Sequence, residues 1–194
     1  MDLIAKGAIY QRFLPHKSNS HWNSIIKQGQ IKNKIPQAWT PPPVGFLKIN
    51  ADSTYKNGDA MAGLVVRNHN DTFLHASTHN HLCLDSNVAE GLALLDACYL
   101  LINLDIKEAI IESDSLVVIS YILSNGSDCS WNLHPIIEKI RRCWNGWPSW
   151  VFKFASAHSL AKWALFCNFE GYVPLNLIPI SVFCDRGHPL VNSI

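Results

Sequence analysis

Apolar and polar positions alternate along residues 46–52, the first part of the chain with a regular pattern. Alternation is typical of a β-strand, because successive side chains of a strand point to opposite faces. One face then carries Leu47, Ile49 and Ala51, and the other carries Phe46, Lys48, Asn50 and Asp52. We therefore predict a strand with an apolar and a polar face, which ends at Asp52.

The same patterns predict the elements that follow. Two more strands are expected at 60–67 and 72–78, joined by a turn at 68–71 that is rich in Asn and Asp. A helix is expected over 87–103, where apolar residues recur at helical spacing on two faces. Residues 108–112 and 150–154 are predicted as strands, and 116–123, 133–143 and 157–169 as helices. The order β-β-β-α-β-α-α-β-α indicates an α/β fold with a five-stranded mixed sheet flanked by helices.

Three consecutive prolines, Pro41 to Pro43, separate this regular part from an irregular beginning. Residues 1–38 are rich in Lys, Gln, Asn and Ser and keep no apolar period. Consecutive prolines cannot join a central strand and favour a stiff, extended connection. A chain of 194 residues suits one ordinary domain. We therefore predict a lead-in at 1–38, a single domain at 39–169 and a C-terminal tail at 170–194.

The composition narrows the class of protein. Hydrophobic residues make up 48% of the chain and charged residues 16%, which excludes a disordered acidic or basic chain. The formal net charge is +1, so any nucleic-acid site must come from a local basic patch. The six cysteines form no C-x-x-C pair, no secretory signal is visible, and the most apolar run, residues 91–104, is too short to span a membrane. We expect an intracellular monomer, in the nucleus or the cytoplasm, with reduced cysteines.

Three acids stand in apolar surroundings. Asp52 ends the first predicted strand, Glu90 opens the central helix, and Asp114 follows the fourth strand. Strand ends and helix starts at one edge of a mixed sheet can lie close together. Clustered carboxylates repel one another unless a cation neutralises them, and oxygen ligands suit Mg²⁺ or Mn²⁺. A pair of such ions is a common device for cleaving phosphodiesters.

Each of these acids also has a purely structural interpretation. Asp52 can simply end a strand and begin a turn. Glu90 can complete a capping box with Asn87, three residues earlier. Asp114 can cap the helix predicted from residue 116. The three residues by themselves leave both interpretations open.

Two further sets of side chains have alternative interpretations. His79, His81 and Cys83 alternate and can share a strand face as a soft-metal site, although a fourth ligand is not evident. The tryptophans can either stack on bases or fill the core; they are Trp131, Trp144, Trp147 and Trp150.

An ordered series of motifs carries a family resemblance. The motifs are Trp39-x-Pro-Pro-Pro-x-Gly45, Lys48-x-Asn50-x-Asp52, Ala62-Gly63-x-Val65-Val66-Arg67, Ala89-Glu90-x-x-Ala93-Leu94, Glu112-Ser113-Asp114-Ser115 and Ala157-His158-x-Leu160-Ala161-Lys162-Trp163-Ala164. Together they resemble plant ribonuclease H-like domains, which are described as reverse-transcriptase-like and derive from non-LTR retroelements. The resemblance spans residues 39–169.

This resemblance implies a ribonuclease H-like fold and endonucleolytic, metal-dependent hydrolysis of the RNA strand in RNA–DNA hybrids, with two Mg²⁺ or Mn²⁺ ions. Asp52, Glu90 and Asp114 match the family's metal ligands. His158 stands where a further acid is expected, and histidine is a poorer Mg²⁺ ligand than a carboxylate. The loop before His158 is shorter than usual, and Ser53 replaces the usual glycine after the first acid.

Residues beside these acids are candidates for contacts with nucleic acid. Asn50 and Ser53 are predicted to contact RNA 2′-hydroxyls. The candidate phosphate contacts are Lys48, Lys56, Arg67, Lys139, Arg141 and Arg142. Because His158 and the short loop depart from the family pattern, one alternative is a module that binds nucleic acid or protein without turnover. A non-functional retroelement remnant is another.

Overall fold

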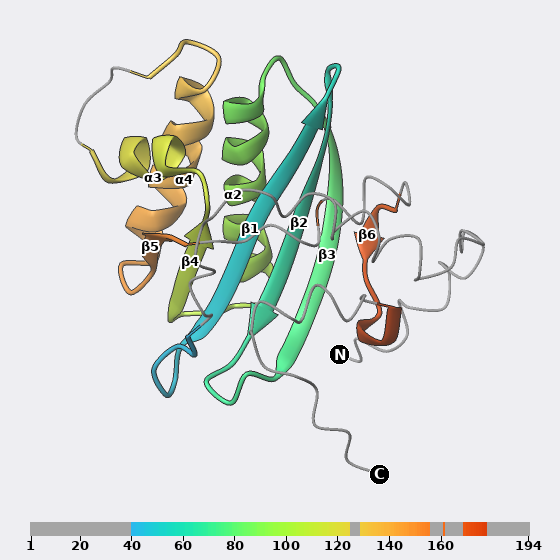
Figure 1. The fold of residues 1–194 in the computed structure, drawn as a ribbon. Helices are drawn as coiled ribbons and strands as arrows, with labels where there is room; N and C mark the ends of the chain where they lie inside the picture. The colour runs from blue at the N-terminus through green and yellow to red at the C-terminus, as the bar shows by residue number, and fades with distance from the viewer. Residues whose placement is uncertain (1–39, 125–128, 156–160, 162–168, 178–194) are drawn as a thin grey trace, which may run out of the picture.

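The computed structural model describes residues 40–124, 129–155, 161 and 169–177, and these residues build a mixed sheet covered by helices (Figure 1). The six strands lie in the order β5-β4-β1-β2-β3-β6. Their bounds are β1 Leu47–Lys56, β2 Asp59–Arg67, β3 Phe73–Leu82, β4 Ala109–Ser113, β5 Val151–Phe154 and β6 Gly171–Tyr172. The described helices are α2 Ser86–Asn103, α3 Leu116–Leu123 and α4 His134–Gly146, and a short 3-10 helix covers Leu175–Leu177. The predicted α/β class and the order of elements up to β5 are confirmed.

The first strand is longer than the predicted one because of its turn. Asn57 and Gly58 both adopt positive φ, 54° and 94°, which is the conformation of a two-residue hairpin turn. This turn pairs Lys56 with Asp59 and carries the antiparallel β1–β2 ladder through its full length. Asp52 therefore lies inside β1, opposite Gly63, and does not end the strand. The Asn-Gly pair is a strong hairpin signal that the alternation pattern alone overlooks.

β1 is the strand at which the direction of the sheet changes. It runs antiparallel to β2 on one side and parallel to β4 on the other, and β5 continues the parallel part. On the far edge, β6 pairs with β3 through Ser77 and Thr78, so the sheet has six strands where we predicted five. The sheet thus continues past residue 169, where we placed the end of the domain. Of the helix predicted over 157–169, all but Ala161 and Phe169 lies outside the described residues.

The central helix α2 packs on β1 and β2 and also contacts α4 (Figure 1). Its N-cap is Asp85, whose side chain accepts a hydrogen bond from the Val88 backbone N–H at 3.0 Å. Gly91 allows α4 to approach closely, because a Cβ atom there would lie 2.7 Å from Leu133 Cδ1. The two apolar faces predicted for this helix therefore correspond to its two packing partners, the sheet and α4.

The core lies between the sheet and the helices. It contains Ile49, Leu64 and Ile111 from the strands and Leu94, Leu101, Ile137 and Ile140 from the helices. Trp150 is buried, with its indole N–H donating to Ile106 O at 3.0 Å, and Trp147 stacks on it. Trp144 and Trp147 pack against the same core, whereas Trp131 is 81% exposed. None of the helices within the described ranges is long and apolar enough to cross a membrane.

Candidate metal centre

Asp52, Glu90 and Asp114 converge on one site. Each contributes a carboxylate oxygen, and these oxygens all lie within 4.8 Å of one another. Asp52 comes from β1, Glu90 from the second turn of α2, and Asp114 directly follows β4. Residues far apart in the sequence thus form a single cluster, here called the acidic cluster.

The topology of the sheet explains why two of these acids are neighbours. The parallel pairing of β1 with β4 ends with Asn50 opposite Glu112. Asp52 and Asp114 each lie two residues further along their strands, so they reach the same level of the sheet. In α/β sheets, ligand sites commonly form at the carboxyl ends of strands where the connections change direction. Asp114 follows the carboxyl end of β4, and it faces Asp52 inside β1, the strand whose two neighbours run in opposite directions.

The helix caps exclude the structural interpretations of Glu90 and Asp114. Asp85 caps α2, so Glu90 is not the acid of a capping box with Asn87. Ser115 caps α3 and accepts a hydrogen bond from the Val118 N–H at 3.4 Å, so Asp114 is not the cap of that helix. Because these acids are not needed to begin the helices, their convergence requires a different explanation.

Glu90 shows the electrostatic character of the acidic cluster. Burial and then the neighbouring Asp52 raise the pKa of the Glu90 carboxyl to about 8, with a smaller increase from Asp114. The Ser53 hydroxyl donates to Glu90 Oε1 at 2.8 Å, which opposes this rise in pKa. Within the described part of the chain, the buried Oε2 of Glu90 has no hydrogen-bond partner. The site therefore requires a proton or a cation to balance its charge.

The donors of the acidic cluster fit a divalent cation. All three are carboxylate oxygens, the ligand type that Mg²⁺ and Mn²⁺ prefer. The unbonded oxygen of Glu90 and the mutual approach of three acids are both features that a cation would satisfy. Among the described residues, no other set of His, Cys, Asp or Glu side chains converges in this way. In particular, His79, His81 and Cys83 do not, and His81 instead contacts Asp96 at 2.6 Å.

Comparison with known families identifies the chain. The family described as reverse transcriptase-like matches residues 50–164, more than half of the sequence. The chain belongs to this family. No curated protein matches it.

Solved structures show which fold this reverse transcriptase-like domain adopts. Ribonuclease H1 of Halobacterium salinarum NRC-1 is 15% identical, with a TM-score of 0.53, over 57% of this chain and 85% of that one. The N-terminal ribonuclease H domain of a Mycobacterium tuberculosis protein is 19% identical, with a TM-score of 0.54, over 60% and 86%. A ribonuclease H1 from compost, solved with an RNA/DNA hybrid, is 21% identical, with a TM-score of 0.53, over 60% and 89%. The predicted ribonuclease H-like fold is therefore confirmed.

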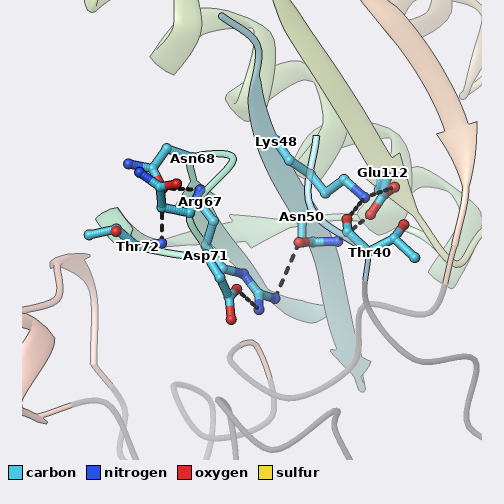
Figure 2. Close-up of polar contacts among 9 residues, drawn as sticks. Thr40, Lys48, Asn50, Arg67, Asn68, Asp71, Thr72 and Glu112 are labelled. Atoms are coloured by element: carbon cyan, nitrogen blue, oxygen red, sulfur yellow. Dashed lines mark hydrogen bonds and ion pairs between the residues drawn. The ribbon is translucent and has the colours of Figure 1, made fainter. Parts of the chain in front are cut away.

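Three of the predicted nucleic-acid contacts of this family member lie in a buried polar network (Figure 2). Lys48 forms an ion pair with Glu112 at 2.6 Å, and Asn50 donates to the other oxygen of Glu112 at 3.0 Å. Arg67 approaches Asn50 at 3.5 Å and Asp71 at 3.4 Å. We call these five residues the polar network. Because Lys48, Asn50 and Arg67 are buried and bound to protein groups, we no longer assign them to a nucleic-acid surface.

The remaining predicted residues have varied surroundings. Ser53 is buried and donates to Glu90, so its role is within the acidic cluster. Arg141 donates to backbone carbonyls at the end of α3, those of Tyr121 and Ser124. Of the basic candidates, Lys56, Lys139 and Arg142 are exposed. His158 and the end of the short loop before it lie outside the described residues.

Sequence reasoning missed the role of Glu112. It lies two residues before Asp114, just as Asn50 lies two residues before Asp52, and this equal spacing was a usable signal. The signal has meaning only when β1 and β4 are known to be parallel neighbours in register. Three elements, β2, β3 and α2, separate the two strands along the chain, so the pairing is a tertiary property.

Proposed function

We propose that this domain hydrolyses the RNA strand of RNA–DNA hybrids, using Asp52, Glu90 and Asp114 as metal-binding carboxylates. The convergence of their oxygens carries the proposal. Membership of the reverse transcriptase-like family and the shared ribonuclease H-like fold support it. One structural neighbour was solved with an RNA/DNA hybrid, the class of substrate that we propose.

The three carboxylates of the acidic cluster would hold Mg²⁺ or Mn²⁺. When bound, such ions activate water as a nucleophile and stabilise negative charge on the leaving oxygen of a phosphodiester. The chain itself supplies the fixed positions of the carboxylates. Asp52 is held by the β1–β2 ladder, and Glu90 is oriented by the Ser53 hydroxyl.

Glu90 couples the binding of a cation to pH. With a pKa of about 8, its carboxyl carries a proton at neutral pH when no cation is present. Because a cation must displace this proton, the affinity of the site for metal rises as the pH approaches 8. The proton and the cation are thus alternative ways to neutralise the same cluster.

The exposed basic residues determine how tightly the domain would bind the phosphates of its substrate. Lys56, Lys139 and Arg142 remain available for phosphates after the polar network is excluded. Each phosphate neutralised by a cationic side chain contributes about one unit to the dependence of log K on log salt. We therefore expect weak hybrid binding that is lost at moderate salt, rather than tight binding.

The test uses the full chain, a labelled RNA–DNA hybrid and either Mg²⁺ or Mn²⁺. We expect cleavage of the RNA strand with metal, none in EDTA, and none of double-stranded DNA. Asp52→Asn removes a ligand and should reduce cleavage by about a thousandfold. Asp59→Asn is the matched control, because it makes the same change at an exposed position of the same hairpin. Lack of cleavage by the wild-type protein, or equal cleavage by Asp52→Asn, contradicts the proposal.

One observation favours a second candidate function, that of a binding module without turnover. His158 occupies the position of a fourth acid, and the loop before it is short. A domain of this kind would bind hybrid in EDTA and leave it uncleaved when Mn²⁺ is added. Gel-shift and cleavage assays on the same samples separate the two functions, because only the enzyme shortens the RNA strand.

A further inference from the structure

The side chains of Asn50 and Glu112 join β1 to β4 at the last registered pair of these parallel strands. Asn50 donates through Nδ2 to Glu112 Oε2 at 3.0 Å. Beyond this pair no further β1–β4 partners are in register. Two residues further along the chain lie two acids of the acidic cluster, Asp52 inside β1 and Asp114 directly after β4. Two residues of strand correspond to about 7 Å. This hydrogen bond, here called the bridge, therefore joins the last pair in register before the chain reaches Asp52 and Asp114.

Glu112 is itself held in a single position. Its second oxygen, Oε1, pairs with the Lys48 ammonium at 2.6 Å, and the two side chains are only 4% and 8% exposed. The same ammonium donates to the Thr40 carbonyl at 2.6 Å (Figure 2). Both carboxylate oxygens of Glu112 thus have partners on β1, the strand that carries Asp52.

The burial of this ion pair indicates a role other than stability. Removing two charges from water is costly, and apolar residues of similar size often stabilise a fold as well or better. What a buried, fully bonded carboxylate does supply is a defined geometry. The continuation of the polar network from Asn50 to Arg67 on β2 extends that geometry across three neighbouring strands.

We propose that Glu112 is a positioning residue for the acidic cluster, which it serves by fixing the separation of β1 and β4 through Asn50. This inference rests on the proposed metal site. Metal ligands must be held to about half an ångström by their supporting groups, and loss of such support typically weakens metal binding about 10- to 100-fold. Glu112 acts through the backbone of the strands, so we expect an effect near the lower end of that range.

Two double variants separate the effect of the Asn50–Glu112 hydrogen bond from the effect of the Lys48 and Glu112 charges. Lys48→Met with Glu112→Gln removes the ion pair but keeps an oxygen that can accept from Asn50. Lys48→Met with Glu112→Leu removes the same charges and also the acceptor. Mn²⁺ affinity is measured by calorimetry and by the electron paramagnetic resonance of bound Mn²⁺. We expect the Gln variant to remain within about threefold of the wild-type affinity and the Leu variant to bind about tenfold more weakly. Equal affinities of the two variants would overturn the proposal.

A metal-free measurement keeps this test distinct from that of the proposed function. Amide hydrogen exchange over residues 51–53 and 113–115 should be about tenfold faster in the Leu variant than in the Gln variant, with the β2–β3 amides unchanged. If the wild-type protein binds no Mn²⁺, the proposed function fails, and equal exchange in the two variants then also rejects positioning by Glu112.

Should the Leu variant not fold by circular dichroism, Asn50→Leu replaces it. This substitution removes the bridge and leaves the Lys48–Glu112 ion pair in place. It should weaken Mn²⁺ binding and accelerate the same exchange to a similar degree. Unchanged affinity and exchange in folded Asn50→Leu protein would overturn the proposal.

Discussion

Two clusters of polar side chains are neighbours at β1 and β4, where Asn50 and Glu112 precede Asp52 and Asp114 by two residues, and their charges are balanced in opposite ways. The polar network contains two cations, Lys48 and Arg67, and two acids, Asp71 and Glu112, and its charges cancel. The acidic cluster contains three acids and no cation among its members. The first is complete within the protein, whereas the second requires something added. This difference separates the polar network from the acidic cluster, a candidate ligand site, more clearly than burial does, because members of both are buried.

The largest expected effect comes from removing one acid of the acidic cluster. Asp52→Asn should reduce hybrid cleavage by about a thousandfold, which corresponds to ~4 kcal/mol of transition-state stabilisation. The same variant should be at least as stable as wild type in EDTA, because it removes a buried carboxylate that faces the other acids of the cluster. Initial rates on a labelled hybrid and thermal unfolding of the same preparation measure both effects. If Asp52→Asn lost activity only because it unfolds, the acidic cluster would behave like the polar network and the comparison between them would fail.

Removing a charge from the polar network is expected to lower the stability of the fold instead. Lys48→Met leaves Glu112 buried without its ion-pair partner, which typically costs about 3–5 kcal/mol of folding free energy. Urea unfolding monitored by tryptophan fluorescence gives the change, with Lys56→Met as an exposed control. A loss below about 1 kcal/mol would show that the network contributes little, and the comparison between the clusters would fail.

The pH dependence of stability tests the acidic cluster without metal. The pKa of Glu90 is raised from 4.5 to about 8 on folding, so the folded state binds more protons than the unfolded state between these values. The contribution of Glu90 to stability in EDTA should therefore be largest below pH 4.5 and should fall as the pH rises to 8. Because Glu90 is partly accessible to solvent, we expect a fall of about 2 kcal/mol. Urea unfolding at several pH values should show a flatter profile for Glu90→Gln.

The smallest expected effect is stabilisation by the cation itself. At about ten times its dissociation constant, Mn²⁺ should add ~1.4 kcal/mol, or about 4 °C in Tm. The gain should grow from pH 6 to pH 8, because the Glu90 proton competes less. Differential scanning calorimetry can compare wild type, Glu90→Gln and the exposed Asp59→Asn control. An equal gain in all three would mean that the ion binds elsewhere.

Much of the site could be predicted from the sequence, but not its organisation. The three acids were identified from their motifs, and the structure brings them together. The burial of the predicted phosphate contacts Lys48 and Arg67 could not be predicted, because a basic residue on the alternating polar face of a strand looks the same whether that face meets solvent or other side chains. The length of β1 was underestimated because alternation was followed only to Asp52, and the hairpin signal of Asn57-Gly58 was overlooked.

The sequence by itself determined the features that depend on interactions between neighbouring residues. They include the central helix, apolar on two sides, the α/β order of elements and the identity of the acids. Only the tertiary structure decided that β4 lies parallel to β1 with Asn50 opposite Glu112, and that a sixth strand joins β3. The physical reason is that strand neighbours are chosen by packing over the whole core, while each strand's own pattern records only which face is apolar. That choice placed one buried polar cluster in charge balance and gave the other three acids that face one another.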